Sequence, residues 1–343
     1  MERLIPSQKQ LKNFIMTKIK PFTIVVTGGL GFIGSRFIKY VYDNTVHNII
    51  NIDKHTYAAD PARIPEHITE DEERYTFLKL DVCSNDLSKY PEVLGADYVV
   101  NFAAESHVDN SIEDGTPFMN TNFMGVYNLL EIFKNAPNLR RFVQISTDEV
   151  YGDMADLRGE QEADESYPLK PSSYYSAAKA SADLLVQSCA RTFGIPYLIT
   201  RTCNNFGPGQ DPEKFLPKIA KSIREGEAVP VYGDGNQARE WMFVDENVEI
   251  IYGLMLIIEE NGIYNIGTGY RCTNNEVIGM ISKAMGQEVK YKYVKDRLGH
   301  DKRYALNCDK VSKKLLLDTY YPLSLYQYIK DTYNPDIIEA HVI

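Results

Sequence analysis

Two pairs of side chains in this sequence have the types and the spacing for acid–base chemistry. Asp148 and Glu149 are adjacent carboxyl groups, and the hydroxyl of Thr147 precedes them. Tyr175 and Lys179 are four residues apart, so on a helix they share a face. A tyrosine normally loses its proton near pH ~10, and a neighbouring ammonium favours the phenolate. We therefore expect Lys179 to lower the pKa of Tyr175 and make it a base near neutral pH.

These side chains need elements that bring them to one place. Short β-rich segments alternate with longer helical patterns, which predicts an α/β fold with a Rossmann-type doubly wound parallel sheet. We expect strands at 23–27, 49–53, 76–80, 98–102, 142–146 and 197–202, and helices at 32–42, 118–133 and 175–192. Ligands of such sheets bind beyond the carboxyl ends of the strands. The carboxyl pair, Tyr175 and the amides Asn204 and Asn205 should all fall on that edge.

A glycine-rich turn follows the first expected strand. Gly28 permits a tight turn, Gly31 lets the backbone approach a pyrophosphate, and Gly34 allows close packing of helix on strand. The second expected strand ends at Asp53, where a carboxylate can bind ribose hydroxyls and would repel a 2′-phosphate. This pattern favours NAD over NADP. Asp81, after the third strand, is placed to reach the adenine amino group.

Composition and charge exclude several classes of function. The formal net charge of −10 over 343 residues argues against a general nucleic-acid-binding protein. No apolar run approaches the ~20 residues of a membrane span. The five cysteines are widely spaced without a CxxC pair, so we expect neither a disulfide framework nor a metal site, and we favour the reducing cytoplasm.

Proline and glycine become frequent after Arg201, which is typical of a lobe built partly from loops. We expect an N-terminal extension over residues 1–20 and an NAD-binding domain over 21–205, with return segments at about 233–270. A smaller mixed α/β substrate lobe is expected over 206–232 and 271–343.

The chain resembles the extended short-chain dehydrogenase/reductase superfamily, and within it the nucleoside-diphosphate-glucose 4,6-dehydratases. The resemblance extends from about residue 22 to at least residue 305. It is carried by residues 26–29 (VTGG), 53–58 (DKHTYA), 103–109 (AAESHVD), 146–152 (STDEVYG), 175–179 (YSAAK), 204–208 (NNFGP) and 296–301 (DRLGHD).

This resemblance implies an NAD-dependent lyase that converts a nucleoside-diphosphate glucose into its 4-keto-6-deoxy derivative, as in deoxysugar (rhamnose) biosynthesis. Tyr175 would take the C4 hydroxyl proton while C4 gives a hydride to NAD, and Thr147 would bond the C4 oxygen. Glu149 would remove the C5 proton, and Asp148 would protonate the departing C6 hydroxyl. The hydride would then return to C6 and a proton to C5. We expect dTDP-glucose as the substrate, and UDP-glucose stays open because one ring methyl separates the two.

Two alternatives remain. A nucleotide-sugar 4-epimerase or decarboxylase would use the same glycine turn, Tyr175 and Lys179, but it would not eliminate water, so Asp148 and Glu149 argue against it. A non-catalytic NAD-binding scaffold predicts degraded catalytic residues, whereas this chain retains them. His107 is interpreted as structural, because Tyr175 and Glu149 already fill the roles of a base.

The resemblance also implies a set of binding residues and a homodimer formed through the helices at 118–133 and 175–192. The expected NAD contacts are Gly28, Gly31, Phe32, Ile33, Gly34, Asp53, Lys54, Thr56, Asp81, Val82, Ala103, Ala104, Ser106, Thr121, Tyr175, Lys179 and Asn205. The expected nucleotide-sugar contacts are Ser106, Thr147, Asn204, Lys214, Phe215, Pro230, Val231, Tyr232, Arg239, Asn274, Arg297 and His300.

Overall fold

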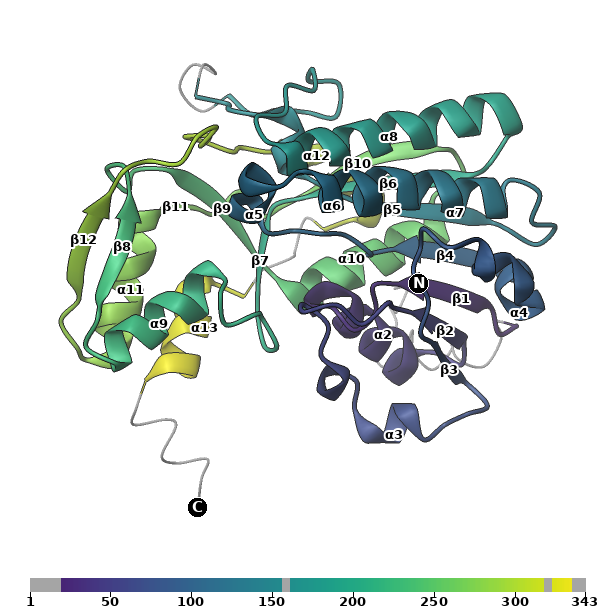
Figure 1. The fold of residues 1–343 in the computed structure, drawn as a ribbon, viewed down its shortest axis with the longest axis horizontal. Helices are drawn as coiled ribbons and strands as arrows, with labels where there is room; N and C mark the ends of the chain where they lie inside the picture. The colour runs from purple at the N-terminus through teal and green to yellow at the C-terminus, as the bar shows by residue number, and fades with distance from the viewer. Residues whose placement is uncertain (1–19, 156–160, 318–322, 335–343) are drawn as a thin grey trace, which may run out of the picture.

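The computed structural model describes residues 20–155, 161–317 and 323–334. Its larger lobe is built on a parallel sheet of seven strands (Figure 1): β1 (Thr23–Thr27), β2 (Asn48–Ile52), β3 (Tyr75–Leu78), β4 (Tyr98–Asn101), β5 (Arg141–Thr147), β6 (Tyr197–Thr202) and β10 (Gly262–Ile266). Their order across the sheet is β10-β6-β5-β4-β1-β2-β3. The predicted doubly wound parallel sheet is therefore confirmed.

Both faces of the sheet are buried, which explains the continuous apolar runs of its strands. One face carries α2 (Phe32–Asn44) and α10 (Val244–Ile257), and the other carries α7 (Gly125–Phe133) and α8 (Tyr174–Phe193) (Figure 1). Successive residues of β1 point to opposite faces. Ile24 and Val26 pack in the same cluster as Phe37 of α2, whereas Val25 packs in the cluster that contains Leu129 of α7.

In the seven-stranded sheet and the three predicted helices, the predictions differ from the structure mainly at two places, and no individual strand or helix was predicted after residue 202. Six predicted strands are present with ends shifted by at most two residues, but β10 was not predicted as a strand. The single helix predicted over 118–133 is broken into α6 (Thr116–Phe118), a π-helical segment (Met119–Met124) and α7. The π-helical turn contains the buried Asn122, whose side-chain amide exchanges hydrogen bonds of 2.8 and 2.9 Å with the backbone of Glu105.

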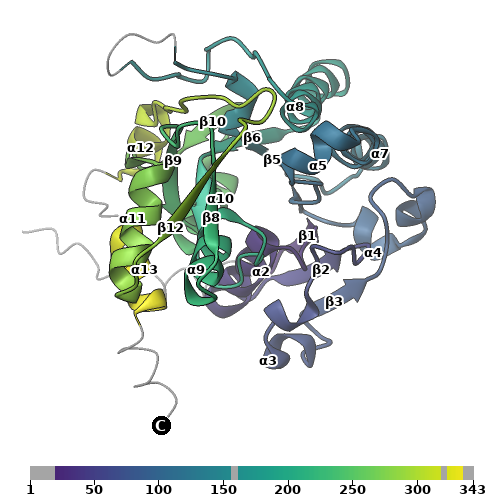
Figure 2. The same ribbon diagram turned by 60° about the vertical axis from the view of Figure 1, so that its left-hand side comes forward.

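The smaller lobe lies beyond the carboxyl edge of β5 and β6, and Figure 2 brings it toward the viewer. It contains a parallel strand pair, β8 (Ala228–Tyr232) with β12 (Lys290–Val294), and the helices α9 (Phe215–Arg224), α11 (Asn274–Met285) and α13 (Leu325–Tyr333). A three-stranded sheet lies between the lobes, in the order β11 (Arg271–Thr273), β9 (Ala238–Phe243), β7 (Asn204–Phe206). The remaining short helices are α3 (Glu66–Thr69), α4 (Pro91–Leu94), α5 (Val108–Glu113) and α12 (Asp309–Leu315).

The chain crosses between the lobes more than once. Within the predicted return segment 233–270, α10 and β10 belong to the larger lobe, whereas β9 pairs with β7 and β11 in the sheet between the lobes. The exact domain boundaries stay a prediction. The expected N-terminal extension lies outside the described residues apart from Lys20. Among the helices of the described ranges, none has the length and apolar character needed to cross a membrane.

Candidate active site

The glycine turn after β1 is shaped by close backbone contacts. Gly28 has a positive φ of 70°, and a Cβ there would lie 2.6 Å from the backbone nitrogen of Ala103. A Cβ on Gly34 would lie 2.4 Å from the carbonyl oxygen of Gly28, so the first turn of α2 packs directly on the loop. No side chain caps α2 at Gly31, and Phe32 and Ile33 line the adjoining groove. The backbone N–H groups at this helix end can therefore receive a pyrophosphate.

Asp53 is held in a fixed orientation just after β2. Its two carboxylate oxygens accept hydrogen bonds from the backbone N–H of Leu30 at 3.1 Å and of His55 at 2.8 Å. The cavity beside it is lined by several of the residues expected to contact NAD, among them Asp53, Lys54, Thr56, Val82, Ala103, Ala104 and Thr121. Lys54 Nζ donates to Thr121 Oγ1 at 3.2 Å across this region. This cavity therefore offers a carboxylate that can bind the hydroxyl groups of a ribose.

Asp81 lies just outside the lining of that cavity. Its carboxylate accepts the backbone N–H of Cys83 at 2.9 Å and faces Lys54 Nζ at 3.8 Å. It lines a neighbouring groove instead, which also contains Cys83 and Asn120. In the structure, Asp81 forms an ion pair with Lys54. Its contact with an adenine amino group stays a prediction.

The carboxyl pair lies where β5 ends, and its two members have different surroundings. Thr147 Oγ1 donates to Asp148 Oδ1 at 3.1 Å and accepts the backbone N–H of Glu149 at 3.3 Å. Asp148 is buried, and its Oδ2 has no hydrogen-bond partner among the described residues. Burial, with the charges of Glu149 and Glu240, raises the pKa of Asp148 well above its ordinary value. The surroundings of Asp148 therefore favour its protonated form.

Glu149 is half-buried and faces the smaller lobe. Burial raises its pKa, whereas the positive charges of Arg239, Arg297 and Lys214 oppose the shift. An ionised Glu149 would therefore be stabilised by more positive charges than an ionised Asp148. Two adjacent carboxyl groups in such unequal surroundings can act as an acid and a base at the same pH.

The expected effect of Lys179 on Tyr175 does not hold in this structure. Burial and the charge of Glu149 raise the pKa of Tyr175, which a hydrogen bond with Thr147 only partly offsets. Lys179 donates to the backbone carbonyl of Ile145, and its own pKa is lowered to about 8 by burial. The four-residue spacing correctly places both residues on α8, but the ammonium is directed to β5. Its charge therefore does not compensate the burial of the phenol.

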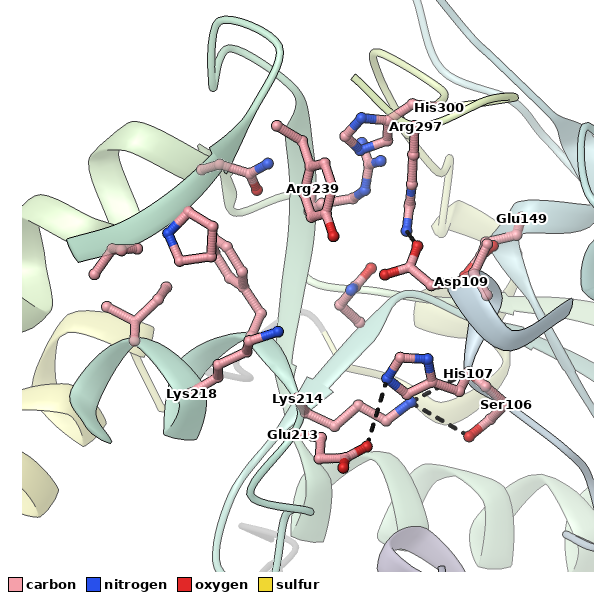
Figure 3. Close-up of a pocket in the computed structure, with 18 of the residues that line it drawn as sticks. Ser106, His107, Asp109, Glu149, Glu213, Lys214, Lys218, Arg239, Arg297 and His300 are labelled. Carbon is pink, nitrogen blue, oxygen red and sulfur yellow. Dashed lines mark hydrogen bonds and ion pairs between the residues drawn. The ribbon is translucent and has the colours of Figure 1, made fainter. Parts of the chain in front are cut away.

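A second pocket lies between the lobes, and Glu149 is one of the residues that line it (Figure 3). Ten of the residues expected to contact the nucleotide sugar line it: Ser106, Asn204, Lys214, Phe215, Pro230, Tyr232, Arg239, Asn274, Arg297 and His300. Val231 does not, because its side chain is buried in the core of the smaller lobe. Strand alternation explains this, since Pro230 and Tyr232 point to the opposite face of β8.

Three cations surround the inner part of this pocket (Figure 3). Lys214 Nζ donates to the carbonyl oxygen of Ser106 at 3.1 Å. Arg297 pairs with Asp109 at 3.4 Å. The guanidinium of Arg239 lies 4.4 Å over the ring of Tyr304 and donates to the carbonyl oxygen of Asp301 at 2.9 Å. Such a cluster suits a diphosphate, which guanidinium groups bind in a bidentate manner.

Several lining residues were not predicted from the sequence. They are His107, Asp109, Glu213, Lys218, Trp241 and Tyr304. His107 and Asp109 belong to the 103–109 motif, and Glu213 precedes Lys214, so the motifs held a signal for these three. His107 was interpreted as structural. Its Nδ1 is buried without a hydrogen-bond partner among the described residues, while its Nε2 lies 3.9 Å from Glu213.

Asn205 lines the cofactor groove with both ends of its amide engaged. Its Nδ2 donates to the carbonyl oxygen of Cys203 at 2.9 Å, and its Oδ1 accepts from Asn247 Nδ2 at 2.9 Å. Tyr175, Lys179, Thr147, Asp148 and Glu149 line the same groove as the glycine turn. The structure therefore brings the predicted cofactor residues and the acid–base residues to one continuous site.

Residues 24–267 match the model of the NAD dependent epimerase/dehydratase family. The chain belongs to this family. It is 41% identical over 313 residues to a dTDP-glucose 4,6-dehydratase from Haemophilus influenzae, covering 85% of this chain and 91% of that protein. It is 43% identical over 288 residues to the low-salt glycan biosynthesis protein Agl12 from Haloferax volcanii, covering 84% and 90%. The resemblance inferred from the motifs is confirmed.

Solved structures agree with this assignment. The dTDP-glucose 4,6-dehydratase DesIV from Streptomyces venezuelae, which was solved with NAD bound, superposes with a TM-score of 0.82 at 37% identity. The match covers 91% of this chain and 95% of DesIV. The whole two-lobed architecture is thus shared with a protein that binds NAD.

The raised pKa of Asp148 predicts a pH-dependent stability. Its neutral form favours the folded state, so the stability that it contributes is full below about pH 4 and is lost as the pH rises through the raised pKa. Asp148→Asn cannot ionise. We expect the variant to gain stability over the wild type as the pH rises above about 4, by at most ~1.4 kcal/mol per pH unit.

Urea unfolding at a series of pH values from 4 to 9 measures this difference. Asp86→Asn is the matched control, because Asp86 is exposed and Lys89 lowers its pKa, so this variant should show no such gain. A constant difference in stability between wild type and Asp148→Asn at every pH would show that Asp148 is ionised in the folded protein.

Proposed function

We propose that this chain is a dTDP-glucose 4,6-dehydratase that forms the 4-keto-6-deoxy sugar with NAD as its cofactor. One observation carries the proposal: Asp148, whose pKa is raised by burial, stands next to Glu149 where the cofactor groove meets the inter-lobe pocket. Elimination of water needs an acid for the leaving hydroxyl and a base for the neighbouring carbon, within reach of one sugar ring. The names of the Haemophilus influenzae relative and of DesIV agree with this reaction.

The fit of NAD rests on the backbone. The space beside Gly28 and Gly31, the uncapped end of α2 and the fixed carboxylate of Asp53 match a pyrophosphate followed by a ribose. When bound, NAD supplies a hydride acceptor for C4 that is restored in the same cycle. Gly28, Gly31, Phe32, Ile33 and Gly34 would hold the pyrophosphate, and Lys179 would reach the nicotinamide ribose.

Tyr175 and Thr147 act at the C4 hydroxyl. The hydrogen bond between them places the phenol and the Thr147 hydroxyl on the same side of the pocket. Tyr175 must lose its proton to act as a base, and burial opposes this loss. We infer that Lys179 leaves the Ile145 carbonyl in the loaded enzyme, so that its charge lowers the pKa of the phenol.

Glu149 and Asp148 then act on the 4-keto sugar. The ketone makes the C5 proton acidic, and Glu149 removes it as a carboxylate supported by Arg239 and Arg297. Asp148 donates its proton to the C6 hydroxyl, which leaves as water. An epimerase or a decarboxylase does not expel a hydroxyl group in its reaction and so gains nothing from a buried acid at this position. A non-catalytic scaffold would gain nothing from either group.

The inter-lobe pocket would bind the nucleoside diphosphate. Arg239, Arg297 and Lys214 lie around the space for the phosphates, and the polar groups of Asn274 and His300 lie near it. Phe215 and Trp241 are stacked with ring centroids 6.3 Å apart, which gives an aromatic wall for the base. We favour thymidine over uridine on the names of the relatives, and the product would enter deoxysugar biosynthesis, with rhamnose as one outcome.

We also propose a homodimer and a cytoplasmic location. The outer surface of α7 and α8 carries exposed apolar side chains, among them Tyr127, Leu184 and Phe193. These two helices lie side by side on the outer face of the sheet (Figure 1). All five cysteines are unpaired, which agrees with a reducing compartment.

The dehydratase proposal predicts the products of a simple incubation. Purified protein, without added NAD, should convert dTDP-glucose into a product lighter by one water, and it should act on UDP-glucose more slowly. Mass spectrometry follows both reactions. Glu149→Gln should lower kcat by about 10²–10⁴-fold, because a positioned base contributes in this range. An isomeric sugar formed without loss of water would instead identify an epimerase.

The dimer proposal predicts that sedimentation of the wild type gives twice the mass of one chain. Leu184→Glu places a charge on the apolar outer face of α8, and it should shift the equilibrium toward monomers. Lys39→Glu, on the exposed surface of α2, is the control and should leave the mass unchanged. A monomeric wild type would exclude the dimer.

A further inference from the structure

Arg63 joins three separate segments of the chain through its side chain. Its Nη1 donates to the carbonyl oxygen of Leu30 at 3.0 Å and to that of Ala58 at 2.8 Å. Its Nε donates to the carbonyl oxygen of Gly209 at 2.9 Å, across a separation of 146 residues. Leu30 belongs to the glycine turn, Ala58 to the loop after β2, and Gly209 to the segment between β7 and α9. No predicted cofactor or substrate set includes Arg63.

The three segments are walls of the cofactor groove. Neighbours of these carbonyls line it from each side, namely Gly31 and Phe32, then Tyr57 and Ala58, then Gln210 and Asp211, and Arg63 itself lines it as well. The first two segments come from the larger lobe, next to the place expected for the pyrophosphate. The third continues directly into Lys214 of the substrate pocket. The bond between Arg63 and Gly209 therefore connects the two sides of the groove.

Local structure fixes Arg63 in this position. It ends a short 3₁₀ helix (Pro61–Arg63) that begins with a proline and is capped by Asp60, whose Oδ1 accepts the Ala62 N–H at 3.0 Å. The next residue, Ile64, is buried in the core. The Asp60 N–H also donates to the Leu30 carbonyl at 3.0 Å, so the loop is already tied to the glycine turn. The Gly209 contact is thus the part of the linkage that depends on the Arg63 side chain alone.

We propose that Arg63 is a positioning residue that retains NAD, by fastening the segment after β7 to the glycine turn across the cofactor groove. Departure of a bound dinucleotide requires these walls to separate. The charged hydrogen bond from Arg63 Nε to the Gly209 carbonyl opposes that opening, and the two bonds from Nη1 hold the Arg63 side chain on the larger-lobe side. This inference rests on the proposed function, in which the same NAD is restored in every cycle and its release serves no step. The bond from Gln210 Nε2 to the carbonyl of Asn205, at 3.1 Å, is internal to the segment after β7 and does not cross the groove.

The test measures NAD retention in the absence of any sugar. The holoenzyme is prepared with radiolabelled NAD, and loss of label is followed after addition of excess unlabelled NAD. Arg63→Met keeps the aliphatic stem and removes all three bonds, so we expect NAD release at least tenfold faster than in the wild type and a lower NAD content after purification. Arg63→Lys keeps one charged donor and should lie between the two.

Arg74→Met is the matched control. The Arg74 guanidinium also donates to three carbonyls, those of Tyr42, Thr45 and His47, but it lines none of the pockets around the cofactor. We expect this variant to lower the unfolding temperature and to leave the release rate of NAD unchanged. A thermal unfolding curve for each variant separates loss of NAD from loss of folding.

Wild-type release rates in both Arg63→Met and Arg63→Lys would overturn the proposal. Equal acceleration by Arg74→Met would also overturn it, because the effect would then be general destabilisation. A wild type that holds NAD tightly but leaves dTDP-glucose unchanged would refute the proposed dehydratase and leave the role of Arg63 standing. The two failures are therefore distinguishable.

Discussion

Two adjacent carboxyl groups cannot both be ionised in a poorly hydrated site without a large electrostatic cost. Asp148 and Glu149 meet this constraint by facing different parts of the molecule. The larger lobe buries Asp148, leaves one of its oxygens without a hydrogen-bond partner among the described residues and raises its pKa, which favours the protonated form. Arg239 and Arg297 face Glu149, and their charges oppose the rise in its pKa that burial causes. The acid and the base of the site are therefore distinguished by the lobe that each one faces.

The parallel sheet makes this arrangement possible because all its strands end at one edge. The glycine turn after β1, Asp53 after β2 and the carboxyl pair after β5 come from distant parts of the sequence, yet they border connected spaces. A buried ion pair between Asp183 of α8 and Arg201 of β6, 2.9 Å apart, fixes the helix that carries Tyr175 and Lys179. The Arg201 guanidinium also bonds the Tyr151 hydroxyl at 3.0 Å, which ties the helix to the segment after the carboxyl pair.

The sequence was sufficient to predict what depends on local pattern. Alternation of apolar strands with amphipathic helices gave the parallel sheet, and the glycine spacing gave the cofactor turn. Strand β10 was missed because it is only five residues long, begins with a glycine and contains the polar Asn265, so that only its pairing with β6 marks it. The π-helical turn was missed because its wider turn departs from the ~3.6-residue repeat of an α-helix without producing a hydrophobic pattern of its own. It is stabilised by a tertiary contact between Asn122 and Glu105.

The sequence also could not predict the directions in which individual side chains point. Spacing placed Lys179 on the same helix face as Tyr175, but it could not indicate that the ammonium turns to the Ile145 carbonyl. Val231 was assigned to the pocket with its neighbours, although strand alternation sends its side chain into the core. Arg63 belongs to no motif, and its three acceptors are carbonyl groups that come together only in the folded chain.

Hydrogen exchange at C5 of the sugar tests the division of labour between Asp148 and Glu149 most directly. Wild type, Asp148→Asn and Glu149→Gln would each be incubated with dTDP-glucose in heavy water, and deuterium and water loss would be measured in the recovered sugar. If Glu149 is the base and Asp148 the acid, Asp148→Asn incorporates deuterium at C5 while losing water far more slowly than wild type, and Glu149→Gln does neither. Deuterium incorporation by Glu149→Gln at the wild-type rate would contradict the assignment.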